Sequence, residues 1–321
     1  MAKAAQIPTR RLGPIEVGAI GVGCVSMAGV YGAADATEAD RVIGRALDLG
    51  ASMLDTADLY GGGGNEELVG KGIAGRRDEV VISTKGGLTN RDPDGYDFVP
   101  IADPDHIREA CEGSLRRLGV DVIDLYYQHR LEPGVPVEET VGVYAELVAE
   151  GKIRAVGLCE VDVETLERAM VVHPISSVQA ELSLWSRDQL DATVPWCAAH
   201  QVGFVPYAPL GRGFLTGKYR SVKDFEAEGD FRAGNPRFQE EALKQNLRLV
   251  DQVEAIAKRH DATAGQVSLA WVLAQGEHIV PIPGMEKLAY LEENLGATEL
   301  ELTAQDLAEL DALPPATGAR Y

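Results

Sequence analysis

The sequence predicts an α/β protein, a (β/α)8 TIM barrel with an N-terminal β-hairpin. Eight short apolar segments alternate with amphipathic segments of helical length, which is the pattern of consecutive βα units. The apolar segments are continuous runs, as expected of parallel strands that are covered on both faces. No Pro- or Ser-rich linker interrupts the alternation. A doubly wound open sheet shares this pattern and remains an alternative.

The expected elements follow the chain in order, beginning with a hairpin at 11–18 around Gly13-Pro14. The expected strands are 19–23, 52–56, 79–85, 121–129, 153–158, 177–182, 203–209 and 278–284. The expected helices are 37–50, 65–75, 103–119, 136–151, 162–172, 187–200, 239–259, 263–275 and 287–296. Gly50 is placed to end the first helix, and Asp103 to cap the third before Pro104.

A single barrel domain is expected across residues 1–321, because such barrels run from roughly 200 to over 400 residues. The segment 221–238 is too long and too polar for an ordinary connection. Segments of this kind are usually functional lids or disordered inserts.

The composition excludes several classes of function. Fifty Asp and Glu residues against thirty Lys and Arg residues give a net charge of −20, which should repel nucleic acid and anionic lipid. The four cysteines are far apart, which argues against a zinc cluster or a disulfide framework, and no metal is expected. The chain has no signal-like apolar core and no apolar run of membrane-spanning length. A cytoplasmic protein that contacts no membrane is expected, and a homo-oligomer is left open.

Three consecutive expected strands end in ionisable residues. Asp55 ends the second strand, Lys85 the third and His129 the fourth, and Tyr60 follows Asp55 by five residues. In a barrel the carboxyl ends of the strands meet on one face, where catalysis takes place. Each residue alone has an ordinary explanation as a cap, a solvent contact or a packing residue. Their coincidence at successive strand ends favours an active site, and Asp58 is expected to be a turn or surface acid.

These four side chains suit the reduction of a carbonyl group. A phenol has a pKa of about 10, and a nearby ammonium should lower it. Asp55 would keep Lys85 charged and oriented, and His129 could hydrogen-bond a carbonyl oxygen. Tyr60 would then donate the proton. The glycines at 61–64 are expected to provide slack in the loop beside it.

Several motifs resemble the aldo-keto reductase superfamily, especially its bacterial and plant reductases and, more distantly, the potassium-channel β subunits. The motifs are "LDTADLYGGGGNEELVGKGI", "ISTKGG", "DLYYQHR", "VEETVGVYAELVAEGKIRAVGL", "YAPLGRGFLTGKY" and "PIPG" with "YLEENLGA". The resemblance extends from about residue 10 to 312 and implies a barrel that reduces aldehydes or ketones with a nicotinamide cofactor, usually NADPH. By this resemblance Asp55, Tyr60, Lys85 and His129 match the catalytic tetrad.

The same resemblance implies a cofactor site. Gln179 would bind the carboxamide, and Tyr207 would stack on the nicotinamide ring. The segment around the pyrophosphate would include Pro209, Leu210, Gly211 and Lys218, and the adenosine end would include Gly284, Glu293 and Asn294. The remaining positions assigned to the cofactor are Gly23, Cys24, Val25, Cys159, Glu286 and Tyr290.

Two positions depart from the pattern of the family. Cys159 stands where many relatives have a serine, and a thiol is a weaker donor to the carboxamide. Met285 and Glu286 stand where relatives often hold the 2′-phosphate of NADPH, and only Lys287 is positive there. NADPH is therefore the expected cofactor, with NADH as the alternative and a weakened preference for NADPH as a hypothesis. Arg232 or Arg237 could restore phosphate binding.

Two other functions are compatible with parts of this pattern. One is a cofactor-binding regulatory module with slow turnover, and the other is a barrel aldolase in which Lys85 forms a Schiff base. A small aldehyde or ketone is the expected substrate, but the sequence does not identify it. Its specificity should come from Val25, Met27, Tyr31, the loop after His129, the segment 221–238 and the tail 314–321.

Overall fold

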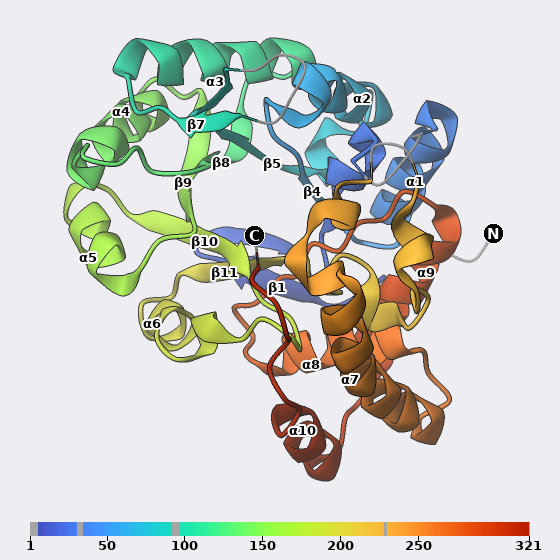
Figure 1. The fold of residues 1–321 in the computed structure, drawn as a ribbon. Helices are drawn as coiled ribbons and strands as arrows, with labels where there is room; N and C mark the ends of the chain where they lie inside the picture. The colour runs from blue at the N-terminus through green and yellow to red at the C-terminus, as the bar shows by residue number, and fades with distance from the viewer. Residues whose placement is uncertain (1–5, 31–34, 92–96, 228–229, 321) are drawn as a thin grey trace.

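The computed structural model describes residues 6–30, 35–91, 97–227 and 230–320, and its centre is a parallel sheet (Figure 1). The strand order is β11-β10-β9-β8-β5-β4-β3. The strands of this sheet are β3 (Val22–Gly23), β4 (Met53–Asp55), β5 (Val81–Gly86), β8 (Ile123–Gln128), β9 (Ile153–Cys159), β10 (Ile175–Glu181) and β11 (Gly203–Tyr207). Neighbouring strands of this sheet follow one another along the chain, apart from the β6–β7 hairpin (residues 88–100) between β5 and β8, and all pair in parallel, as the predicted βα units require.

The segment 279–284 closes the barrel in the place of the predicted eighth strand. Parallel bridges join it to Phe204 of β11 on one side and to Gly23 of β3 on the other. Pro281 and Pro283 have no N–H group to donate, so the segment makes bridges and not a regular strand. The (β/α)8 prediction is therefore confirmed, with an irregular eighth position.

Helices surround the barrel in Figure 1, and most lie where the sequence predicts them. Their bounds are α1 (Ala36–Asp48), α2 (Gly64–Gly72), α3 (Pro104–Leu118), α4 (Val137–Ala149), α5 (Val163–Val172), α6 (Thr193–Ala199), α7 (Glu240–Arg259), α8 (Ala264–Ala274), α9 (Leu288–Leu295) and α10 (Ala304–Asp311). Asp103 caps α3 by accepting a hydrogen bond of 2.9 Å from the N–H of His106, as predicted. Helix α10 and a small hairpin of β6 (Leu88–Asn90) and β7 (Phe98–Pro100) were not predicted.

Short 3-10 helices complete the connections. They are η1 (Cys24–Ala28), η2 (Tyr60–Gly63), η3 (Arg77–Glu79), η4 (Asp188–Leu190), η5 (Phe214–Thr216), η6 (Val222–Phe225), η7 (Phe231–Gly234), η8 (Pro236–Phe238) and η9 (Gly296–Glu299). Three of them lie in the segment predicted to be a lid or an insert. Phe225 and Phe238 of this segment are buried, so its described part is folded onto the protein.

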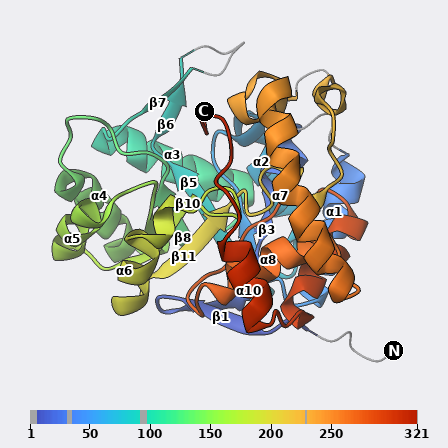
Figure 2. The same ribbon diagram turned by 60° about the horizontal axis from the view of Figure 1, so that its bottom comes forward.

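The predicted N-terminal hairpin covers one end of the barrel. Strands β1 (Thr9–Leu12) and β2 (Ile15–Gly18) pair in antiparallel fashion, and Figure 2 shows β1 at the bottom of the molecule, with the end of the chain marked C at the top. Leu12 and Val17 pack with Met53 and Leu125 inside the barrel. A Cβ atom at Gly203 would lie 2.4 Å from the side chain of Leu12. The first residue of β11 must therefore be glycine for the hairpin to pack against the barrel.

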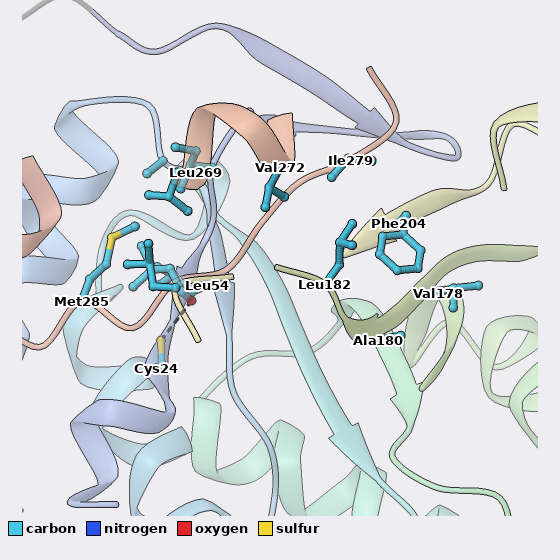
Figure 3. Packing of buried hydrophobic residues seen from close by; sticks show 14 of the residues in the cluster. Cys24, Leu54, Val178, Ala180, Leu182, Phe204, Leu269, Val272, Ile279 and Met285 are labelled. Atoms are coloured by element: carbon cyan, nitrogen blue, oxygen red, sulfur yellow. Dashed lines mark hydrogen bonds between the residues drawn. The ribbon is translucent and has the colours of Figure 1, made fainter. Parts of the chain in front are cut away.

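A second apolar layer lies between the barrel and its helices. Figure 3 shows Leu54, Phe204 and Ile279 of the barrel wall with Leu269 and Val272 of α8. Its side chains form one cluster of buried residues. The polar groups of the barrel lie at the carboxyl ends of the strands, at the end opposite the hairpin. Among the described residues, no helix combines the length and apolarity that a membrane crossing needs.

Candidate active site

A buried ion pair lies at the carboxyl ends of β4 and β5. The ammonium of Lys85 donates to Asp55 Oδ1 at 2.5 Å and to the carbonyl oxygen of Thr56 at 2.7 Å. The other carboxylate oxygen accepts from Ser83 Oγ at 2.7 Å and from Gln179 Nε2 at 2.9 Å. These donors offset the cost of burying the carboxylate, because a buried charge is tolerated when it is paired and hydrogen-bonded.

The ammonium of Lys85 stays charged. Burial by itself would lower the pKa of Lys85, but the negative charge of Asp55 and the hydrogen bond to it oppose this effect, and the pKa is raised. A Schiff-base lysine must be available as the neutral amine, and Lys85 is fully buried beneath the cavity wall in an ion pair. The geometry therefore gives no support to the aldolase hypothesis.

Tyr60 lies beside this pair at the start of η2. Its hydroxyl is 3.5 Å from Lys85 Nζ. Burial raises the pKa of Tyr60, and although Lys85 opposes this effect, the net direction is upward. The expectation that Lys85 would bring the pKa below its ordinary value is therefore wrong, because the ammonium only partly offsets the loss of water. The phenol stays protonated at neutral pH.

The glycine run after Tyr60 has a defined conformation. Gly61, Gly62 and Gly63 have φ values of +57°, +62° and +95°, which are left-handed and favour glycine. A Cβ atom at Gly63 would also lie 2.7 Å from the side chain of Arg117. The run is thus required by the turn that places the phenol, and it is not slack.

His129 follows β8 and faces the phenol. Its backbone N–H donates to the carbonyl oxygen of Gly86 at 2.8 Å. Its ring contacts the ring of Tyr60 edge-on, with centroids 6.1 Å apart and planes at 80°. Burial, followed by the positive charges of Lys85 and Arg130, holds the pKa of His129 well below its ordinary value of 6.5. The imidazole is neutral, and its Nδ1 is buried without a hydrogen-bond partner among the described residues.

Asp58 differs from its expectation in one respect. It lies in a turn, as predicted, but its carboxyl group is not at the surface, because Oδ1 is buried and has no partner in the described part of the chain. Burial, with a smaller contribution from Glu66, raises the pKa of Asp58 to about 7.

The candidate residues line one cavity of about 460 Å³ at this end of the barrel. A volume in this range fits a small-molecule site. The wall contains these residues of the predicted site: Asp55, Tyr60, His129, Gly23, Val25, Gln179, Tyr207, Pro209, Leu210, Lys218, Gly284, Glu286, Tyr290, Glu293 and Asn294. Residues from both halves of the chain therefore meet at one place.

Three positions assigned to the cofactor do not line this cavity. The thiol of Cys24 is buried in the apolar layer and contacts the carbonyl oxygen of Val22 at 3.7 Å, as Figure 3 shows. Cys159 is buried at the end of β9, where burial raises its pKa to about 12. Gly211, with a φ of +57°, packs against the ring of Trp185. Any contribution of these positions must come through the backbone they shape.

Met285, discussed above for the choice of cofactor, and Met27, expected to contribute to substrate specificity, do not line the cavity either. Met285 is fully buried in the apolar layer (Figure 3), and Met27 is buried in the same cluster. The Met285 side chain faces the core and does not line the cavity, so the lack of a hydrogen-bond donor on it does not affect the binding of a phosphate there. Tyr31 lies outside the described residues.

The end of the cavity beyond Tyr207 carries charged side chains of both signs. Lys218 Nζ donates to the hydroxyl of Tyr290 at 2.7 Å, and Lys287 Nζ lies 5.5 Å from the centre of the same ring. Glu286 is close enough to help raise the pKa of Lys218, after the larger effect of Tyr290. Lys218 lines this end together with the carboxylates of Glu286 and Glu293, whereas Lys287 contacts Tyr290 without lining the cavity. The ammonium of Lys218 is therefore the group here that could bind a phosphate.

The two arginines of the long segment have other partners. Arg232 lines the cavity, but its guanidinium is held by Asp230 at 2.6 Å and lies 4.5 Å from the ring centre of Tyr219. Arg237 Nη1 donates to Ser186 Oγ at 2.7 Å and does not line the cavity. The structure therefore does not support phosphate binding by Arg237. Arg232 could reach a phosphate in the cavity only while its guanidinium is also held by Asp230.

The structure also adds residues that the sequence reasoning missed. These residues are Arg212, Thr216 and Tyr219, which line the cavity. Arg130 and Phe231 also line it, and they belong to the loop after His129 and to the segment 221–238, which were expected to contribute to specificity. Arg212 has a signal in the sequence, because it lies between two glycines and shares their left-handed backbone, with a φ of +57°. Tyr219 has no such signal, since its place depends on how the chain after β11 folds.

A larger hollow of about 1100 Å³ lies elsewhere, between the C-terminal ends of α2 and α3. It contains none of the predicted site residues, and its lining alternates in charge, with Arg77, Arg116 and Arg154 beside Asp78 and Asp121. Among the described residues, no group of His, Cys, Asp and Glu side chains could hold a metal ion. The smaller cavity is therefore the candidate active site.

The chain is similar over nearly its whole length to known reductases. Residues 19–314 match the model of the aldo/keto reductase family. The chain is 43% identical over 325 residues to "Probable aldo-keto reductase 1" of Glycine max, covering 99% of this chain and 92% of the relative. It is 43% identical over 324 residues to "Aldo-keto reductase yakc [NADP(+)]" of Schizosaccharomyces pombe, covering 98% of this chain and 94% of the relative.

Solved structures agree with this result. A glycerol dehydrogenase from Gluconobacter oxydans has a TM-score of 0.86 at 28% identity, covering 97% of this chain and 95% of that chain. An aldo-keto reductase from Klebsiella pneumoniae, in complex with NADPH, has a TM-score of 0.74 at 28% identity, covering 99% and 97%. By fold, by sequence and by the residues that meet in its cavity, the chain belongs to the aldo/keto reductase family.

Proposed function

We propose that this protein is a single-domain reductase, spanning residues 1–321, that converts a small aldehyde or ketone to the alcohol with NADPH and uses Tyr60 as the proton donor. The observation that carries the proposal is the approach of the Tyr60 hydroxyl to within 3.5 Å of the Lys85 ammonium at the wall of the cavity. A protonated phenol beside a fixed positive charge is suited to donate a proton and to have the resulting phenolate stabilised.

Each member of the tetrad has a separate task in this mechanism. Bound NADPH supplies the hydride to the carbonyl carbon. His129, which is neutral and lines the cavity, orients the carbonyl oxygen by a hydrogen bond from its ring. Tyr60 gives its proton to that oxygen as negative charge develops there. Lys85 stabilises the phenolate, and Asp55 holds Lys85 in place.

The cofactor assignment has independent support. The Klebsiella pneumoniae relative binds NADPH, and the Schizosaccharomyces pombe relative is named for NADP(+). In this chain Lys218 lines the cavity beside Tyr290 and Lys287 lies near the same ring, so ammonium groups are available to a phosphate although Glu286 and Glu293 line the same end. We infer that NADPH is the cofactor, and NADH remains the alternative that the negative charge of Glu286 would favour.

The test is a screen of aldehydes and ketones in which the oxidation of NADPH and of NADH is followed by absorbance. We expect turnover of at least one substrate class with a higher kcat/KM for NADPH. An advantage of a thousandfold or more would exclude the hypothesis of a weakened NADPH preference. Tight binding of the cofactor without turnover of any carbonyl would favour the regulatory module over the reductase.

A further inference from the structure

The C-terminal segment runs from α10 back to the mouth of the barrel. Figure 2 shows the dark red chain leaving α10 and extending away from the β1 end, and Figure 1 shows it crossing in front of the barrel near β10. Thr317 N–H donates to Asn246 Oδ1 at 2.8 Å, and the carbonyl oxygen of Arg320 accepts from Asn235 Nδ2 at 2.9 Å. These bonds fix the segment onto the chain between η7 and α7.

Arg320, on this segment, reaches two carboxylates at the strand ends. Its Nη2 donates to Glu160 Oε2 at 2.7 Å, and its Nε lies 3.7 Å from Glu181 Oε2. Glu181 is almost fully buried and also lies 3.4 Å from Arg212, which lines the cavity. The contact is therefore partly withdrawn from water, where a charge-assisted hydrogen bond is stronger than at an open surface.

Glu160 connects this arginine to the cavity. It follows β9, and its carboxylate accepts from the backbone N–H of Glu181 at 3.0 Å, from Arg320 and from the hydroxyl of Tyr207. Burial would raise the pKa of Glu160, but these hydrogen bonds lower it, so the carboxylate stays ionised. Glu160 has a φ of +52°, an unfavourable left-handed conformation for this residue. Such strain persists only where surrounding contacts hold it, and often at functional sites.

Tyr207 connects Glu160, and through it Arg320, to the cavity. It ends β11, directly beside Glu181 in the register with β10, and it lines the cavity. Ala208 after it has a φ of +47°, so the backbone turns sharply at this point. The hydroxyl of Tyr207 is anchored to Glu160, and its ring is left to face the cavity. The orientation of this ring therefore depends on where Glu160 is held.

We propose that Arg320 is a positioning residue, which acts through Glu160 to hold the Tyr207 ring against the nicotinamide end of the bound cofactor. The inference rests on the proposed function, because it assumes that NADPH occupies this cavity. Its consequence is that the last residues of the chain complete the cofactor site, although they are more than 100 residues from Tyr207 in sequence.

The first experiment measures the Kd of NADPH by quenching of protein fluorescence, together with KM and kcat. We expect Arg320→Gln to raise the Kd and the KM for NADPH by roughly tenfold, the scale of one hydrogen bond to a charged group, with a smaller change in kcat. Arg320→Lys keeps the charge and should recover part of the loss. The matched control is Arg168→Gln, which breaks an exposed pair with Glu138 on α4 and should leave the Kd unchanged.

The second experiment asks whether Arg320 acts through Glu160. In a Glu160→Gln background, Arg320→Gln should change the Kd by less than about twofold, because residues that act on one contact are not additive. An unchanged Kd in the single variant Arg320→Gln would overturn the proposal. So would a tenfold effect that persists in the Glu160→Gln background, since the arginine would then act on the cofactor directly.

The controls separate this inference from the proposed function. Wild-type protein that neither binds NADPH nor reduces a carbonyl would refute the proposed function. Wild-type protein that does both, with Arg320→Gln behaving in the same way, would refute only the role of Arg320. The melting temperature of each variant shows whether a change in Kd comes from loss of the fold.

Discussion

The two walls of the cavity are built in different ways. One wall comes from β4, β5 and β8, and its ionisable groups are buried and held by short hydrogen bonds at strand ends. The opposite wall comes from the chain after β11 and from the segment 282–294, which includes most of α9, and it carries Arg212, Lys218 and Arg232 as well as Glu286 and Glu293. Its backbone has left-handed residues other than glycine at Ala208 and Arg212.

This difference teaches how the site divides its tasks. Regular strands fix the first wall, so its side chains are set before any ligand arrives, as proton transfer requires. Loops form most of the second wall, where backbone N–H groups and cations can surround an anionic ligand. Variants of the first wall should therefore change the chemical step, and variants of the second wall should change binding.

The largest expected effect breaks the first wall. Tyr60→Phe removes the proton donor and keeps the ring, so kcat for carbonyl reduction should fall by at least about a hundredfold, with the Kd of NADPH nearly unchanged. Steady-state kinetics and fluorescence quenching measure the two quantities. Tyr126→Phe is the matched control, because the hydroxyl of Tyr126 is buried outside the cavity without a partner among the described residues. Retained reduction in Tyr60→Phe would remove Tyr60 from its role.

The next effect tests the second wall. Lys218→Ala removes an ammonium that lines the cavity and is bound to Tyr290, so the Kd of NADPH should rise by roughly tenfold while kcat changes little. Lys223→Ala removes the same charge from the exposed helix η6 and should leave the Kd as it is. A loss of kcat larger than the loss of binding would contradict the division between the walls.

The two walls also differ in how well the sequence predicted them. Asp55, Lys85 and His129 could be found because each ends a visible apolar run, and the barrel then brings strand ends together. The pair of Glu160 and Arg320 could not be found, because the contact joins residues that no local pattern links. The missed helix α10 has only eight residues, and the prolines at 281 and 283 hide an eighth strand that the apolar pattern still indicated.

A smaller effect concerns the loop that carries Tyr60. The pKa of Asp58 is raised from its ordinary value of 3.8 to about 7, so the folded protein binds this proton more tightly than the unfolded chain. The stability that Asp58 contributes is complete below about pH 4 and is lost as the pH rises to about 7. Asp58→Asn should therefore increase the free energy of unfolding at pH 8 by about 1 kcal/mol, a value reduced for partial exposure, and should change it little at pH 4.

Urea unfolding at several pH values measures this slope. Asp40→Asn, at an exposed position of α1, is the matched control and should leave the slope unchanged. Glu66, Arg117 and Lys85 also act on the Asp58 carboxyl group, so the slope belongs to Asp58 only if it is reduced in Asp58→Asn. An equal slope in the variant and in the wild type would show that the carboxyl group does not titrate in this range.

The smallest expected effect is a nearly constant rate across neutral pH. Burial keeps the pKa of Tyr60 above its ordinary value and that of His129 well below, and Asp55 helps to keep that of Lys85 high. None of the three groups changes its charge between pH 6 and 8, so kcat for reduction should vary by less than about twofold. A shallow change that disappears in Asp58→Asn would come from the loop. A change of kcat with pH that persists in Asp58→Asn would show that a catalytic group titrates between pH 6 and 8. A decrease toward low pH would indicate protonation of His129, and a decrease toward high pH would indicate loss of the Tyr60 proton.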